Sequence, residues 1–155
     1  MLAHEAKYLR HAMELCRNEI APYPTPEFPV GNCKFASLLL AYHYFQLVDD
    51  IEIVMVSGFS DNMVSHVWLE IGGYVFDVTG DQYNTIDDYH LNPTVIAARP
   101  YPAIHVEEVK LSYLYRLFGK LEYLSLDRGF SAFKARFVAK MGSSHEYLIA
   151  IKPEV

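Results

Sequence analysis

The 155-residue sequence has no long hydrophobic run. Its most apolar stretches are interrupted by His43 and by Asp49-Asp50, and they fall short of the roughly 18 to 20 uncharged residues that a membrane helix needs. Ionisable side chains occupy positions 4, 5, 7 and 10, where a signal peptide would need an apolar segment. We therefore expect no membrane partner and a cytoplasmic location, with export by a specialised secretion system left open.

Cysteine and basic residues are also scarce. Two cysteines, Cys16 and Cys33, cannot build a disulfide framework in a chain of this size, which fits a reducing compartment. The 13 Lys and Arg residues are outnumbered by 19 Asp and Glu, for a net charge of −6. This balance argues against a nucleic-acid partner, because phosphate binding depends on clustered basic side chains.

Nucleotide and metal motifs are missing as well. The paired glycines Gly72-Gly73 lie between two β-rich runs, which indicates a hairpin and not a phosphate-binding loop. Cys33, His66 and Asp77 are acceptable zinc ligands, but no C-x-x-C or H-x-x-x-H element accompanies them. We expect no metal and no cofactor.

A single α+β domain spanning residues 1–155 is the fold that the composition and the patterning favour. The content of 52% apolar and 21% charged residues is typical of a globular protein. An apolar stripe predicts a helix over 2–20, and an apolar run after Asn32, a good N-cap, predicts a buried helix over 32–48. Strands are predicted over 51–58, 64–71 and 74–79, forming an antiparallel sheet against the central helix.

The remaining segments are assigned by local composition. Alternating prolines over 21–29 predict an extended segment, and the polar residues 79–92 predict a long loop or single helical turns. We predict a strand over 94–98, helices over 106–141 with a break at 127–129, and a last edge strand over 147–151.

Cys33 lies where a cysteine becomes nucleophilic. As the first residue of the predicted helix, it meets the positive end of the helix dipole, which favours the thiolate. Its own N–H, which the helix does not use, is also placed to bind a developing oxyanion. Cys16, in contrast, falls on the apolar stripe of the first helix, where an inert buried thiol is expected.

The predicted hairpin supplies a base and an acid. Strand alternation places His66, Trp68 and Glu70 on one face. With Gly72 and Gly73 as the turn residues, Asp77 lies on the face of His66, within reach of its side chain. A carboxylate there can hold one ring nitrogen of His66 and leave the other for the thiol, which is the arrangement of nucleophile, base and orienting acid.

Three motifs together resemble the transglutaminase-like branch of the papain-like cysteine enzymes. They are Gly31-Asn32-Cys33 before an apolar helix, the Ser65–Ile71 strand with its His-x-Trp-x-Glu pattern, and the stretch from Asp77 to Gln82. The resemblance covers residues 29–83. It implies a papain/transglutaminase-like core with Cys33 as nucleophile, His66 as base and Asp77 as orienting acid.

The oxyanion hole departs from the papain-like pattern. Papain-like proteases place a glutamine before the cysteine, whereas Gln46 and Gln82 both follow it here. The second oxyanion donor is therefore unassigned. The candidate substrate-binding or oxyanion residues are Asn32, Trp68 and Gln82, and Trp68 is equally a core aromatic.

The predicted activity is hydrolysis of amide or peptide bonds by a thiol peptidase, amidase or glutamine deamidase that forms an acyl-enzyme on Cys33. The substrate would be a peptide, a protein or a small amide. Two alternatives stay open: transfer of the acyl group to an amine, as in transglutaminases, and a non-catalytic interaction protein that retains the fold. The oligomeric state is not predicted.

Overall fold

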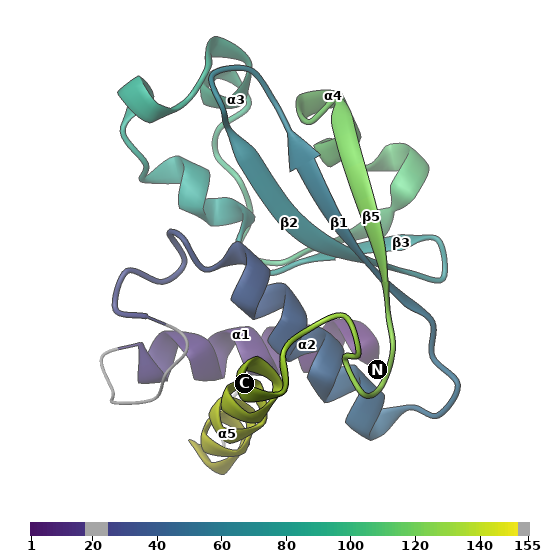
Figure 1. Ribbon diagram of the computed structural model, residues 1–155. Helices are drawn as coiled ribbons and strands as arrows, with labels where there is room; N and C mark the ends of the chain where they lie inside the picture. The colour runs from purple at the N-terminus through teal and green to yellow at the C-terminus, as the bar shows by residue number, and fades with distance from the viewer. Residues whose placement is uncertain (18–24, 152–155) are drawn as a thin grey trace.

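An antiparallel sheet separates two groups of helices in the computed structural model, which describes residues 1–17 and 25–151 (Figure 1). Within this part of the chain the sheet has five strands in the order β4-β3-β2-β1-β5, with every neighbouring pair antiparallel. Their bounds are β1 Ile53–Phe59, β2 Ser65–Ile71, β3 Tyr74–Asp77, β4 His105–Glu108 and β5 Lys120–Leu126. The α+β prediction is confirmed.

The longer helices cover one face of the sheet, and the short ones lie over the other (Figure 1). On the first face lie α1 (Leu2–Cys16), α2 (Cys33–Leu47) and α5 (Ala135–Ile151). On the second lie α3 (Pro93–Ala97) and α4 (Leu114–Leu117), with short 3-10 turns η1 (Gly80–Asn84), η2 (Asp88–His90) and η3 (Val109–Leu111) elsewhere. Each face therefore has its own apolar core, the first around α2 and the second around Trp68.

The β2–β3 hairpin has the predicted register. Ile71 pairs with Tyr74 across Gly72 and Gly73, whose φ angles of 57° and 82° suit a tight two-residue turn that other residues rarely adopt. The predicted strands 51–58, 64–71 and 74–79 are observed as β1, β2 and β3, with ends shifted by two residues or fewer. The predicted helix 32–48 is observed as α2.

The helical prediction for 106–141 is wrong over most of its length. This segment contains β4, η3, α4 and β5, and α5 begins only at Ala135. No residue of β5 is fully buried, but its pairing with β1 along all seven residues outweighs the local helical preference. The expected break at 127–129 is present as the connection between β5 and α5.

Two short strand predictions are also wrong. The segment 94–98 forms α3, because Pro93 occupies its first turn and the Asn92 side chain accepts a hydrogen bond from the Val95 N–H at 3.0 Å, a strong helix start. The segment 147–151 is the end of α5, where only Leu148 is buried. Its apolar residues lie along the helix that packs on α1 and α2.

The N-terminal predictions are confirmed in part. The helix predicted over 2–20 is observed over Leu2–Cys16, and residues 18–20 lie outside the described residues, as do residues 21–24 of the predicted extended segment. Residues 25–31 are not extended. They form successive turns, in which Phe28 N–H donates to Thr25 O and Val30 N–H donates to Glu27 O.

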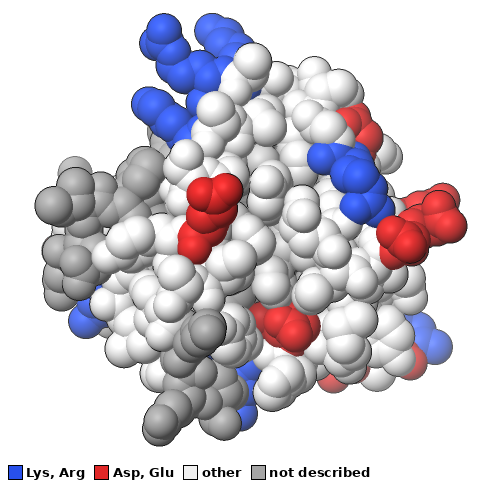
Figure 2. Space-filling view, turned by 90° about the horizontal axis from the view of Figure 1, so that it is seen from below, with Lys and Arg blue, Asp and Glu red and all other residues white. Residues whose placement is uncertain are grey.

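The surface beneath the helices carries charges of both signs. Figure 2 shows a group of Lys and Arg at the upper left of this face and further ones at its right side and lower edge, with Asp and Glu scattered among them. The basic side chains form no continuous stripe across the described part of this view. In residues 1–17 and 25–151, no helix is both long enough and apolar enough to span a membrane.

A chain of hydrogen bonds joins the three long helices. His43 of α2 lies with Nε2 2.8 Å from Glu5 Oε2 of α1 and with Nδ1 2.9 Å from His145 Nε2 of α5. Because a carboxylate only accepts, His43 donates from Nε2, and its Nδ1 accepts from His145. Burial and the neighbouring His43 lower the pKa of His145 to about 4.

Acidification should therefore weaken the contact between α5 and the other helices. Between about pH 6.5, the ordinary pKa of histidine, and about pH 4, the unfolded chain binds a proton at His145 that the folded chain does not, so stability falls as the pH drops through this range. Urea unfolding at several pH values should show a smaller loss for His145→Gln than for the native chain. The control His4→Gln changes an exposed histidine, and equal slopes in both variants would contradict the assignment.

Candidate active site

Cys33 is the first residue of α2 and is half-buried. Its thiol is hydrogen-bonded to the side chain of His66 and to the backbone of Val67 on β2. The helix start thus brings the sulfur to the sheet. Because the first N–H groups of a helix lack acceptors within it, the Cys33 N–H is oriented away from the helical hydrogen-bond ladder.

Asn32 shapes the turn before Cys33. It occupies the predicted N-cap position, but its side chain makes no capping bond. The side-chain oxygen accepts from Thr25 N–H at 3.1 Å, and the amide nitrogen donates to Thr25 Oγ1 and to Val30 O at 2.9 Å. Asn32 is buried, so its observed contacts are structural ones within the turn.

The first turn of α2 docks on a part of β2 that β3 does not reach. The β2–β3 pairing runs from Leu69 to Ile71, which leaves the backbone of Val67 outside this ladder. The Cys33 thiol is hydrogen-bonded to the backbone of Val67. Ser37 Oγ donates to Val67 O at 3.2 Å. Ser37 follows Cys33 by one helical turn, and sequence reasoning missed it.

His66 and Asp77 form a fully buried pair at the predicted place. His66 Nε2 lies 2.8 Å from Asp77 Oδ2, with both side chains 0% exposed. The other carboxylate oxygen, Oδ1, accepts from Thr79 N–H at 3.1 Å. Because Asp77 holds Nε2, the Nδ1 atom of His66 is directed at Cys33.

The paired charges shift both pKa values. Burial alone raises the pKa of Cys33, but its hydrogen bond with His66 and the attraction to this ring outweigh burial, so the pKa is lowered. Burial alone lowers the pKa of His66, but Asp77 and Cys33 outweigh it and raise the pKa to about 10. Electrostatics therefore favours proton transfer from the thiol to the ring.

Gln82 lies between the cysteine turn and the histidine. Its Nε2 is 3.2 Å from His66 Nδ1, and its Oε1 accepts from Gly31 N–H at 3.3 Å. The side chain is buried. Of the three candidate substrate-binding or oxyanion residues, Gln82 is the one that contacts the histidine by a hydrogen bond.

Trp68 is placed in the core. The side chain is fully buried, and its indole N–H donates to Tyr115 Oη at 3.0 Å. A Cβ atom on Gly58 of the neighbouring strand would lie 2.6 Å from the indole, so the glycine makes room for the ring. With its N–H already used, Trp68 has no donor for a substrate in this arrangement.

Aromatic rings enclose the histidine. The Tyr83 ring lies edge-on at 5.2 Å from the His66 ring, and Phe118 lies 5.9 Å away. The Tyr83 hydroxyl donates to Ser65 O. These contacts exclude water from the side of His66 that faces the second core.

Arg10 of α1 contacts the segments on both sides of the site, and the sequence did not predict this role. Its guanidinium forms two bonds with Asp81, of 2.7 and 2.8 Å, and donates to Val78 O at 2.6 Å. It also lies 4.8 Å from the centre of the Phe28 ring. Arg10 thereby links the turn before Cys33 to the segment that follows Asp77, although nothing in its sequence position indicates this.

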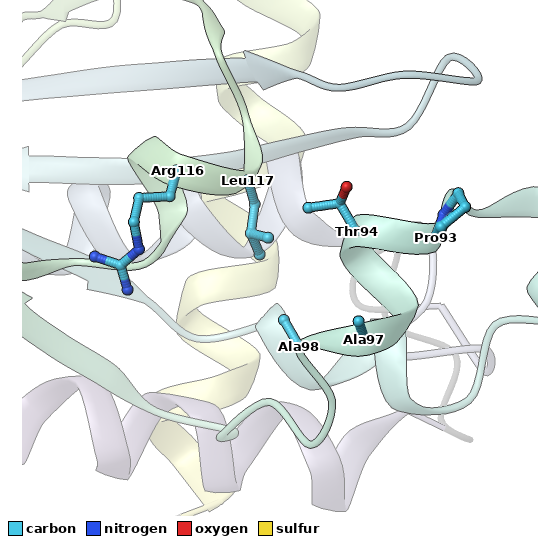
Figure 3. A pocket seen from close by; sticks show the side chains of 6 residues that line it. All are labelled: Pro93, Thr94, Ala97, Ala98, Arg116 and Leu117. Carbon is cyan, nitrogen blue, oxygen red and sulfur yellow. The ribbon is translucent and has the colours of Figure 1, made fainter.

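A separate hollow of about 600 Å³ lies between α3 and α4. Figure 3 shows Leu117 of α4 and Thr94 of α3 facing it from two sides. Its lining contains none of the predicted site residues. In the described part of the chain, no group of three or more His, Cys, Asp or Glu side chains is arranged to hold a metal ion.

Comparisons with protein families, with curated proteins and with solved structures found no match for this chain.

The geometry predicts a reactive thiol at Cys33. Iodoacetamide should modify Cys33 near neutral pH and spare Cys16, which is fully buried, because only an accessible thiolate is alkylated. His66→Gln should slow the reaction about tenfold by removing the partner that lowers the thiol pKa. Intact-protein mass spectrometry measures the rate. The exposed His90 supplies the matched control His90→Gln, and a similar slowing there would refute the role of His66.

Gly80 should be needed for the position of Asp77. A Cβ atom there would lie 2.8 Å from Asp77 Oδ2 and 3.3 Å from Tyr113 Oη, so Gly80→Ala must displace the carboxylate. We expect a stability loss of about 1 to 3 kcal/mol and slower alkylation of Cys33. At Gly129 the nearest atom would be 3.5 Å away, which makes Gly129→Ala the control. Equal behaviour of the two variants in urea unfolding and alkylation would count against this constraint.

Proposed function

We propose that the protein is a cysteine-dependent hydrolase that cleaves amide or peptide bonds through an acyl-enzyme on Cys33. The observation that carries the proposal is the continuous hydrogen-bonded series from Cys33 through His66 to Asp77. A half-buried thiol, a base with its second nitrogen held, and a buried carboxylate make up the unit that activates a nucleophile.

Acylation uses the two sides of His66 separately. The ring takes the Cys33 proton at Nδ1, and Sγ attacks the substrate carbonyl carbon to form a C–S bond while the carbonyl becomes an oxyanion. The Cys33 N–H at the start of α2 is the first candidate donor to that oxygen, and the Nε2 group of Gln82 is the second. When the C–N bond breaks, Nδ1–H protonates the leaving amine.

Hydrolysis then restores the thiol. His66 accepts a proton from water at Nδ1, the hydroxide oxygen attacks the acyl carbon, and the C–S bond breaks as the sulfur regains its proton. Throughout both halves Asp77 accepts from Nε2–H and stabilises the imidazolium. Asp77 touches neither substrate nor sulfur in this scheme, so its loss should be less damaging than that of Cys33 or His66.

The resemblance of residues 29–83 to transglutaminase-like cysteine enzymes supports the same proposal. We infer a papain/transglutaminase-like core, in which α2 carries the nucleophile at its N-terminus and packs on β2. The substrate class is a peptide, a protein or a small amide, including the carboxamide of glutamine.

The acyl-enzyme should be visible as a burst. With an activated ester or amide in excess, we expect rapid release of one equivalent of leaving group, followed by slower turnover. Cys33→Ala should abolish the burst, and His66→Ala should remove nearly all turnover, because members of such a unit act together. Asp77→Ala should retain more activity than either.

The same substitution at the other cysteine, Cys16→Ala, is the control and should keep the burst. Stopped-flow absorbance with a chromogenic leaving group measures both phases. Undiminished turnover in Cys33→Ala would assign the activity to another residue and overturn the proposal.

A further inference from the structure

Two hydrogen-bond donors face a single acceptor on His66. Asp77 accepts from Nε2, so a neutral ring carries its proton there and has one lone pair, on Nδ1. Toward this lone pair point the thiol of Cys33 and the Nε2 amide group of Gln82, at 3.2 Å.

The contacts of Gln82 determine which end of its amide faces the ring. Gly31 N–H donates to the side-chain oxygen at 3.3 Å, and a reversed amide would place two donors against each other there. The backbone of Gln82 is also held: its N–H donates to Thr79 O, and its carbonyl accepts from Thr85 and Ile86. The NH₂ group is therefore directed at His66 Nδ1.

We propose that the Gln82 amide weakens the Cys33–His66 ion pair in the unoccupied site, and that full proton transfer from Cys33 to His66 requires this amide to leave Nδ1. Once Nδ1 carries a proton, the ring has an N–H on each side. The amide of Gln82 then meets a donor instead of an acceptor. Gln82 thus opposes the ion pair that Asp77 and the thiol favour.

Substrate offers the displaced amide a new partner. This step rests on the proposed function: a carbonyl oxygen beside Cys33 can accept the Gln82 N–H that Nδ1 releases, so formation of the ion pair is coupled to binding. An unoccupied site keeps a less reactive thiol. The thiolate is therefore more populated when a substrate carbonyl is bound than when the site is unoccupied.

Other ionisable groups around His66 are few and have fixed roles. Asp77 lies at Nε2, Cys33 at Nδ1, and Tyr83 packs edge-on against the ring. Burial and the charges of Cys33 and Asp77 raise the pKa of Tyr83 far above neutrality, so it stays uncharged. Trp68 and Phe118 complete the surroundings.

The test compares Gln82→Met with Gln46→Met. Methionine keeps the length of glutamine but has no N–H donor, and Gln46 is exposed near the end of α2. The rate of Cys33 alkylation by iodoacetamide is followed from acid to alkaline pH. For Gln82→Met we expect the profile to move to lower pH, with alkylation about fivefold faster near pH 5 and nearly unchanged at high pH, as for loss of one hydrogen bond of ordinary strength. Gln46→Met should match the native chain.

An unchanged profile overturns the proposal, and so does a shift to higher pH, which would show that Gln82 stabilises the imidazolium instead. Gln82→Leu replaces the methionine variant if far-ultraviolet circular dichroism shows that the latter does not fold. Alkylation needs no turnover. If the pH profile of alkylation shifts as expected but no acyl-enzyme burst is seen, the proposed hydrolase function is rejected and the role of Gln82 still stands.

Discussion

The early end of β3 is the constraint on which the site depends. β3 stops at Asp77 while β2 extends back to Ser65, so the backbone of Val67 is left outside the β2–β3 ladder. Buried backbone groups need partners, and the first two turns of α2 provide them through Cys33 and Ser37. Cys33 is thus positioned by the same contacts that complete the edge of β2, and a longer β3 would displace it.

The buried His66–Asp77 pair is better explained by chemistry than by stability. Removing two ionisable groups from water is unfavourable, and such pairs add little to folding unless every lone pair is used. Here Asp77 accepts on both oxygens, and Gly80 leaves space for the carboxylate. Two histidines in this fold have opposite pKa shifts: Asp77 and Cys33 outweigh burial and raise the pKa of His66, whereas burial together with the neighbouring His43 lowers the pKa of His145. His43 also contacts an acid, Glu5, so what distinguishes His66 is its place between a carboxylate and a cysteine thiol.

Local patterns predicted the centre of the site because its members lie in short, strongly patterned segments. Two glycines set the turn, and alternation then placed His66 and Asp77 on one face. Contacts between distant segments were not predictable in this way. No local sequence pattern marks Ser37 or Gly80 as part of the site, and the direction of the Gln82 amide depends on its contact with Gly31. The helix prediction for 106–141 was wrong for the same reason, because pairing with the distant strand β1 makes β5 a strand.

The glutamine contact shows why residue types alone do not define the state of such a site. Cysteine, histidine and aspartate predict an ion pair, since each neighbouring charge favours it. The neutral amide of Gln82 disfavours this ion pair through the direction of its N–H group. Nδ1 of His66 cannot accept a hydrogen bond from Gln82 and carry a proton at the same time. The amide in turn is oriented by the backbone of Gly31, two residues before Cys33. The turn that brings Cys33 to β2 therefore also orients the amide that faces Nδ1 of His66.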